Sequence, residues 1–292
     1  MAALPKDLQS LLDRPPVYRL LNVADRVEGR HLNHVWKGLV GTGYDEPGLP
    51  VFVKLLPSQA QIDIELACGL ASQVLKLPVP MPGVVLADPE DLPGLPPRDY
   101  GSEVVLFGSV FQAPDQFLER RKRELQAHGD DYLWNRVCSS DTAPKGAAWD
   151  ELVANPDRHI DNFLFDGIKW WLFDHNQALQ PVATLYAEVV GSNAQAQVVS
   201  HVARANQLLE QLRDRHLETA SVDIEAETFL KQARKLKLLA TGMRSWRVEG
   251  DRISQIFQMA ALIVDLIALR LEPLSLYIAQ RLERPDAESL WS

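Results

Sequence analysis

Apolar residues in the first 110 positions follow the short-period pattern typical of β-strands. Strands are expected at residues 18–23, 51–56, 84–87 and 102–111. Between the second and third of them, Ser58 is followed three residues later by Gln61, which is a capping-box pattern, and apolar residues then recur every four positions up to Val74. This pattern predicts one amphipathic helix over residues 58–75, which the prolines from Pro78 onward bring to an end.

Beyond Pro114 the periodicity becomes mainly helical, with helical patterns at residues 115–128, 149–154, 185–215, 225–239 and 256–271. The last of these is the most apolar, but polar residues interrupt it and it falls short of the roughly 20 apolar residues of a membrane span, so a buried helix is expected. The pattern therefore predicts an α+β protein. Residues 1–110 form a small β-rich part with an antiparallel sheet and one regulatory-type helix, and residues 111–292 form a larger, mainly helical part.

The composition narrows the function classes. The chain has 292 residues, of which 46% are hydrophobic and 24% charged, as in ordinary soluble globular proteins. Its net charge of −9 argues against direct binding of nucleic acid. The two cysteines fit neither a disulfide framework nor a zinc site, and the N-terminus lacks the apolar stretch of a signal peptide. We expect a cytoplasmic protein without membrane association.

The chemistry is concentrated in residues 150–176. Asp157 and Asn162 lie five positions apart on an expected loop that also carries His159, and two short apolar strands, 163–165 and 169–173, then lead to Asp174. Phosphoryl transfer from ATP needs a carboxylate that orients or deprotonates the acceptor hydroxyl, and oxygen ligands that hold magnesium on the phosphates. Each residue alone is explained as a cap, a turn residue or a strand-end acid. Their combination in this order favours a catalytic loop at 155–162 and a metal-binding segment at 172–176.

The N-terminal part offers candidates for binding the nucleotide. Lys54 lies in the middle of an expected strand, and Glu65 lies at the edge of the apolar stripe of the expected helix. Kinases neutralise the α- and β-phosphates with such a lysine and hold it with a helix glutamate, although the strand alternation also permits a solvent-facing lysine. Gly29 and Asn33, between two expected strands, are candidates for covering the phosphates, and an ordinary hairpin turn is the alternative.

The run Asn155-x-Asp157-x-His159-x-x-Asn162-Phe163 resembles the catalytic loop of the HipA-like kinases, and its Asp-Arg-His-x-x-Asn portion is more distantly similar to the phosphatidylinositol 3/4-kinases. The resemblance implies a bilobal protein-kinase-like fold and the use of ATP and Mg²⁺. It assigns catalysis to Asp157 and the metal to Asn162 and Asp174, and His159 would brace the loop or contact the transferred phosphate. The sequence departs from the ordinary kinase pattern because His175 and Asn176 follow Asp174 in place of Phe-Gly, and the glycine-rich phosphate loop of HipA is not found.

The sequence thus predicts an ATP- and magnesium-dependent phosphotransferase, of which a HipA-like serine/threonine protein kinase is the first interpretation. The resemblance implies a protein acceptor, and an antitoxin or regulatory partner if the kinase is of the toxin type. The alternatives are a phosphatidylinositol or small-molecule kinase and a catalytically inactive kinase-fold binding module. The absence of Lys and Arg between Lys169 and Arg204 disfavours a phosphoinositide head group. Two basic clusters, residues 120–123 and 231–237, are either solvated helix faces or docking sites for an anionic partner.

Overall fold

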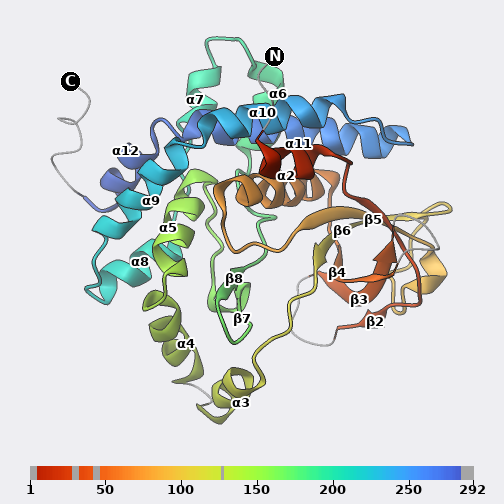
Figure 1. Ribbon diagram of the computed structural model, residues 1–292, viewed down its shortest axis with the longest axis horizontal. Coiled ribbons are helices and arrows are strands. Elements are labelled where there is room, and N and C mark those ends of the chain that lie inside the picture. Colours follow the sequence, from red (N-terminus) through yellow and green to blue (C-terminus); the bar gives the residue numbers. More distant parts are fainter. Residues whose placement is uncertain (1–4, 28–32, 42–46, 126–127, 284–292) are drawn as a thin grey trace.

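The computed structural model describes residues 5–27, 33–41, 47–125 and 128–283. The elements of the N-terminal part are α1 (Lys6–Leu12), β1 (Val17–Leu20), β2 (Asp25–Arg26), β3 (His34–Gly41), β4 (Leu49–Leu55), α2 (Gln59–Leu75), β5 (Pro82–Ala87), the short 3₁₀ helix η1 (Pro89–Asp91) and β6 (Val104–Val110). The elements that follow are α3 (Gln116–Leu125), α4 (Gly129–Cys138), α5 (Thr142–Leu152), η3 (Ile160–Asn162), β7 (Phe163–Phe165), β8 (Trp170–Leu172), α6 (Val182–Val189), α7 (Gln195–Val199), α8 (Gln207–Asp214), α9 (Ala220–Leu230), α10 (Ala233–Ser245), α11 (Asp251–Arg270) and α12 (Leu274–Arg281). A sheet-containing N-terminal part is therefore followed by a mainly helical remainder, as expected (Figure 1).

The strands of the N-terminal part pair in the order β1-β5-β6-β4-β3-β2, and β1 also pairs with β3. Five strands therefore close into a ring. The predicted antiparallel sheet is wrong in one respect, because β1 and β5 run parallel, with Tyr18 opposite Val85. Helix α2 is the reason: it connects β4 to β5 as a crossover, so β5 runs in the same direction as β4 and β1, and parallel strands require such a connection.

The inside of this ring has its own small core. Trp36 of β3 and Val53 of β4 are fully buried there beside Leu106 of β6. The indole Nε1 of Trp36 donates to the carbonyl of Pro93 at 2.9 Å, which joins the loop after β5 to the ring. Lys54 alternates with these residues on β4, opposite Val35 and Phe107, so its side chain leaves the ring on the opposite face.

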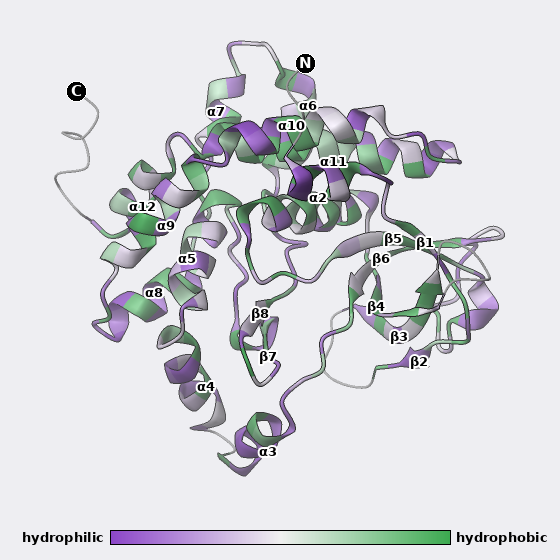
Figure 2. Ribbon diagram, in the orientation of Figure 1, coloured by the Kyte–Doolittle hydropathy of each residue, from purple (hydrophilic) through white to green (hydrophobic). Residues whose placement is uncertain are grey.

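Helix α2 confirms the predicted helix almost to the residue. Ser58 is its N-cap and its hydroxyl accepts the N–H of Gln61 at 3.4 Å, whereas Lys76 ends the helix in a left-handed conformation with φ 59°. The helix contacts β5 and β6 on one side and α11 on the other. Figure 2 shows it as a largely hydrophobic ribbon in the middle of the molecule, and nearly every position beyond the first turn is buried.

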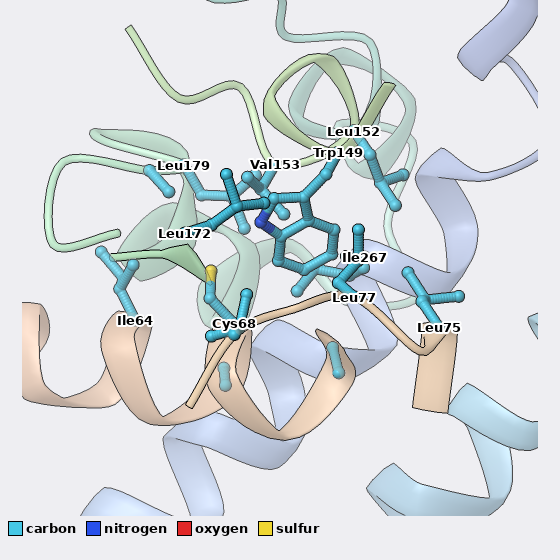
Figure 3. Close-up of a cluster of buried hydrophobic side chains, with 14 of the residues drawn as sticks. Ile64, Cys68, Leu75, Leu77, Trp149, Leu152, Val153, Leu172, Leu179 and Ile267 are labelled. Atoms are coloured by element: carbon cyan, nitrogen blue, oxygen red, sulfur yellow. The ribbon is translucent and has the colours of Figure 1, made fainter. Parts of the chain in front are cut away.

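The main core runs without interruption from α2 into the helical part. Trp149 of α5 is fully buried at its centre, with Ile64 and Cys68 of α2, Leu172 of β8 and Ile267 of α11 nearby (Figure 3). Burying a side chain of this size stabilises the fold by roughly 2–3 kcal/mol relative to leaving it exposed. The N-terminal and helical parts are thus joined through α2 by a shared apolar core.

Several features of the helices were not expected. Helices α1, α4 and α12 lie outside the predicted ranges, and the helix predicted over 225–239 is divided into α9 and α10. Helix α1 packs on α10, where the Trp246 indole donates to the Leu12 carbonyl at 3.0 Å and Lys235 pairs with Asp7 at 2.9 Å. The predicted helix over 185–215 is instead the three helices α6, α7 and α8. The chain turns after α6 at Gly191, whose φ of 78° suits glycine.

Helix α11 corresponds to the apolar pattern of residues 256–271. Among the described residues it is the one helix that is long and apolar enough, by length and composition, to cross a bilayer. Its apolar side chains lie in the main core against α2 and α10. Arg270, which interrupts the apolar run, is itself fully buried and donates to the Val199 carbonyl at 2.7 Å and to the Glu151 carbonyl at 3.2 Å.

Candidate active site

The loop after α5 is shaped by a buried asparagine. Ala154 turns the chain with φ 46°, and the Asn155 amide then donates to Asp150 at 3.0 Å and accepts the N–H of Asp157 at 3.2 Å. Asn155 is fully buried, so these bonds form in a place that water does not reach. The position of Asp157 is therefore fixed by the end of α5.

Hydrogen bonds also bring Asn162 and the segment before Asp174 to Asp157. The Asn162 amide Nδ2 donates to the Asp157 carbonyl at 2.6 Å, and the Asn162 carbonyl accepts the N–H of Phe173 at 3.0 Å. No hydrogen bond or ion pair among the described residues uses the Asp157 carboxylate or Asn162 Oδ1. Both oxygen groups are thus available to a ligand.

Asp174 leaves β8 with φ 59°, a left-handed conformation that aspartate tolerates. Its Oδ2 lies 3.3 Å from the Lys54 ammonium, while its Oδ1 is buried and has no hydrogen-bond partner among the described residues. Burial raises the pKa of this carboxyl group above its ordinary value, and the positive charge of Lys54 opposes that shift. A buried carboxylate oxygen without a partner is the kind of atom that a bound cation would satisfy.

Lys54 and Glu65 lie on neighbouring elements, with 3.6 Å between the ammonium and the Glu65 Oε1. Burial would lower the pKa of Lys54, but Glu65 and Asp174 outweigh it and raise that pKa. Burial would likewise raise the pKa of Glu65, but Lys54 and then His175 lower it to about 2. Both groups are therefore charged at neutral pH. The lysine is only 13% exposed and does not face solvent as an ordinary strand lysine would.

The residues that hold this arrangement together were not among the site residues predicted from the sequence. Arg158 and Asp150 are both fully buried and pair through two guanidinium nitrogens. Arg158 also donates to the carbonyl of Phe173, and its Nη2 lies 3.0 Å from His175 Nε2. Burial is the largest cause that lowers the pKa of His175, so the imidazole is neutral. The sequence carried one signal for this network. Arg158 lies between two site candidates, Asp157 and His159, and follows the acidic residue Asp150 by eight positions.

The remaining candidates are less connected. His159 is half-buried, and among the described residues no hydrogen bond reaches its imidazole, although its carbonyl accepts the N–H of Asn162 at 3.0 Å. Arg158 braces the loop through its own contacts, and a contact of His159 with the transferred phosphate stays a prediction. Asn33 precedes β3 at the end of the sheet near Lys54, since the next residue, His34, lies opposite Leu55. Gly29 lies outside the described residues.

The residues present fit magnesium bound together with a nucleotide. No group of three or more His, Cys, Asp or Glu side chains in the described ranges is arranged to hold a metal ion. Asn162 Oδ1 and Asp174 Oδ1 are nevertheless two oxygen atoms on adjacent backbone segments, and neither has a hydrogen-bond partner among the residues that the structure describes. Magnesium in phosphotransferases takes one or two protein oxygens and completes its shell with phosphates and water.

Two cavities of about 300 Å³ each lie away from these residues. One is lined by α1, α2 and Lys235, and the other by Ser58, Arg98 and Arg252. Neither contains Lys54, Asp157 or Asp174. The site is therefore recognised by the convergence of its polar groups.

Comparison with known proteins adds little to this geometry. No protein-family model matches the chain, and no curated protein matches its sequence. Among solved structures it is similar to the crystal structure of a Helicobacter pylori proinflammatory kinase, CtkA, with 12% identity and a TM-score of 0.47 over 88% of this chain and 99% of that one. This likeness concerns the overall arrangement alone.

Proposed function

We propose that this chain is an ATP- and magnesium-dependent phosphotransferase that acts on a hydroxyl group, and that it is a serine/threonine protein kinase of HipA-like type. The observation that carries the proposal is the position of Lys54 between Glu65 and Asp174, at 3.6 and 3.3 Å. These residues come from a strand, a helix and the segment after a hairpin. A buried lysine held by two carboxylates beside a loop with a free Asp and Asn is suited to binding a polyphosphate.

The roles follow from the chemistry of each group. Lys54 neutralises phosphate charge, and Glu65 keeps it oriented. Asn162 and Asp174 hold Mg²⁺, which, when bound, would neutralise charge that develops on the phosphates. Asp157 orients the acceptor hydroxyl and takes its proton, for which its carboxylate is free. Asn33 and Gly29 remain proposed as the residues that cover the phosphates.

The acceptor is proposed to be a protein side chain, as the resemblance to HipA-like kinases implies. An antitoxin or regulatory partner, and a cytoplasmic location, stay predictions of the sequence. The phosphatidylinositol and small-molecule alternatives differ from the main proposal in the acceptor alone. The site geometry is common to all three.

The test compares the wild-type chain with Asp157→Ala and with Asp161→Ala. Asp161 is an exposed acid on the same loop that pairs with Lys122 at 2.5 Å, so it is a matched control. Two quantities are measured, each in Mg²⁺ and in EDTA. They are the equilibrium binding of a fluorescent ATP analogue and the transfer of labelled phosphate from ATP to proteins of a cell lysate. We expect Asp157→Ala to bind the nucleotide and lose roughly 10²–10⁴-fold in transfer rate, as removal of a general base does. Asp161→Ala should stay close to wild type.

Three results would contradict the proposal or one of its parts. If the wild-type chain does not bind the ATP analogue in the presence of Mg²⁺, the site is not a nucleotide site. If it binds the analogue but transfers and hydrolyses no phosphate with any acceptor, the chain is the inactive binding module. Equal transfer by Asp157→Ala and wild type would remove Asp157 from its role.

A further inference from the structure

A chain of buried polar groups connects the catalytic loop to helix α2. It runs from Asp150 through Arg158 and His175 to Glu65, and from Glu65 to Lys54. The first four side chains in this series are all at most 3% exposed. His175 joins the two halves of the series. Asp150 of α5 and Arg158 of the loop lie on one side of it, and Glu65 of α2 and Lys54 of β4 lie on the other.

The contacts fix which nitrogen of His175 carries the proton. An arginine side chain only donates hydrogen bonds, so His175 Nε2, which lies 3.0 Å from Arg158 Nη2, must accept. The proton of the neutral ring is therefore on Nδ1. That atom faces Glu65 Oε2 at 3.7 Å, slightly longer than a hydrogen bond, and points a donor at the carboxylate.

The ring itself is held in place by its surroundings. The Trp149 indole contacts it edge-on, with 5.9 Å between the ring centroids and an interplanar angle of 73°. The His175 carbonyl accepts the N–H of Ala178 at 2.8 Å, which fixes the backbone after Asp174. An imidazole with both nitrogens directed and its plane packed has one orientation available.

A phenylalanine at this position would fill the same space but make neither polar contact. Arg158 would keep Asp150, whereas Glu65 Oε2 would lose the donor that faces it. The carboxylate would then keep Lys54 and the backbone N–H of residue 175, but it would lose the side-chain donor. Since Glu65 Oε1 has no hydrogen bond among the described residues, the His175 ring is the side-chain donor that orients this carboxylate.

We propose that His175 is a positioning residue for phosphotransfer, which links Arg158 of the catalytic loop to Glu65 of α2 and thereby keeps Lys54 directed at the nucleotide. This inference rests on the proposed function. It gives the departure from Phe-Gly after Asp174 a specific role, because a ring with one donor and one acceptor connects the two parts of the site. His175 acts through Glu65 and does not touch the reacting atoms.

The experiment uses His175→Phe, His175→Gln, Glu65→Gln and the double variant His175→Phe/Glu65→Gln in the full chain. Phenylalanine keeps the ring volume, and glutamine keeps one acceptor and one donor. For each variant we measure three quantities: the equilibrium affinity for a fluorescent ATP analogue, kcat/KM for phosphate transfer from ATP, and the thermal midpoint of unfolding. We expect His175→Phe to lose roughly 10–100-fold in kcat/KM, the usual range for residues that orient a site, and to bind the analogue more weakly. His175→Gln should recover most of the kcat/KM and most of the affinity for the analogue.

The double variant separates positioning from a merely structural role. If His175 acts through Glu65, its substitution adds little once Glu65 is changed, so the two effects are strongly non-additive. Additive effects on kcat/KM, or a His175→Phe variant that matches wild type in binding and turnover, would overturn the inference while leaving the proposed function intact. A wild-type chain that neither binds the analogue nor transfers phosphate overturns both.

Discussion

Arg158 and Asp150 form an ion pair in which both side chains are fully buried, with 2.9 Å between Nη2 and Oδ1 and 3.0 Å between Nε and Oδ2. The pair connects the end of α5 to the loop that carries Asp157. Arg158 also donates to the carbonyls of Asn162 and Phe173, so one guanidinium fixes the loop, the hairpin and the segment that leads to Asp174. The geometry of the candidate site therefore depends on a residue that is not itself a candidate for chemistry.

Breaking this ion pair should destabilise the folded chain. We expect Arg158→Met to lower the free energy of unfolding by about 3–5 kcal/mol, because it leaves the Asp150 carboxylate buried without its partner. Urea denaturation followed by circular dichroism measures the change. The matched comparison is Arg158→Met with Asp150→Leu, which removes both charges and should recover part of the loss. A single variant as stable as wild type would contradict the interpretation.

Asp63 should make stability depend on pH. It is 4% exposed, its Oδ1 has no hydrogen-bond partner within the described residues, and burial raises its pKa from 3.8 to about 8. The folded chain therefore binds a proton that the unfolded chain releases above pH 4, so stability falls as the pH rises from about 4 to about 8, on the order of 1 kcal/mol per pH unit.

The variant Asp63→Asn removes this titration without changing the size of the side chain. Its thermal midpoint should exceed that of wild type near pH 8, and the difference should shrink towards pH 4. If the stability of the two proteins changes in parallel with pH between these limits, the pKa of Asp63 is not raised on folding and the prediction is wrong.

Gly69 should be intolerant of alanine although it lies inside α2. Alanine normally stabilises a helix interior by roughly 1 kcal/mol relative to glycine. At Gly69, however, an added Cβ would lie 2.6 Å from Cγ of Pro82, part of a rigid ring on β5. We expect Gly69→Ala to destabilise the chain by about 1–3 kcal/mol through this overlap, measured by denaturation.

Gly242 of α10 is the control for this prediction. Its added Cβ would lie 2.5 Å from Cδ1 of Leu12, the far end of a flexible side chain that can move aside. Gly242→Ala should therefore be tolerated or mildly stabilising. Equal effects at the two positions would show that close contact with Pro82 does not limit the placement of α2.

Asp174→Asn should change the requirement for magnesium. The substitution keeps the shape of the side chain but removes the charge that attracts a cation, so the Mg²⁺ concentration for half-maximal binding of an ATP analogue should rise at least about tenfold. In EDTA the variant should bind the nucleotide no more weakly than wild type, because no metal ion is then present. Asp161→Asn provides the control, and identical Mg²⁺ titrations for Asp174→Asn and wild type would exclude Asp174 as a metal ligand.

The local pattern of residues was sufficient to predict much of the secondary structure. The strand at 51–56, the helix at 58–75 and the hairpin at 163–173 follow from periodicity, caps and turn residues, and the structure contains all three. The pattern failed where a long-range contact decides the outcome. Strand β1 pairs parallel to β5 because α2 returns the chain to the same end of the sheet, and α1 forms against α10, more than 200 positions away.

The sequence by itself determined the candidate chemistry: an Asp, an Asn and a second Asp in a loop-and-hairpin order, with a lysine and a glutamate on the preceding strand and helix. The tertiary structure decided that Lys54 lies between Glu65 and Asp174, and that Arg158 and His175 hold the site together. The physical reason is that spacing along the chain specifies which groups share a loop. Only packing determines which charges are buried together, and burial is what makes those contacts strong.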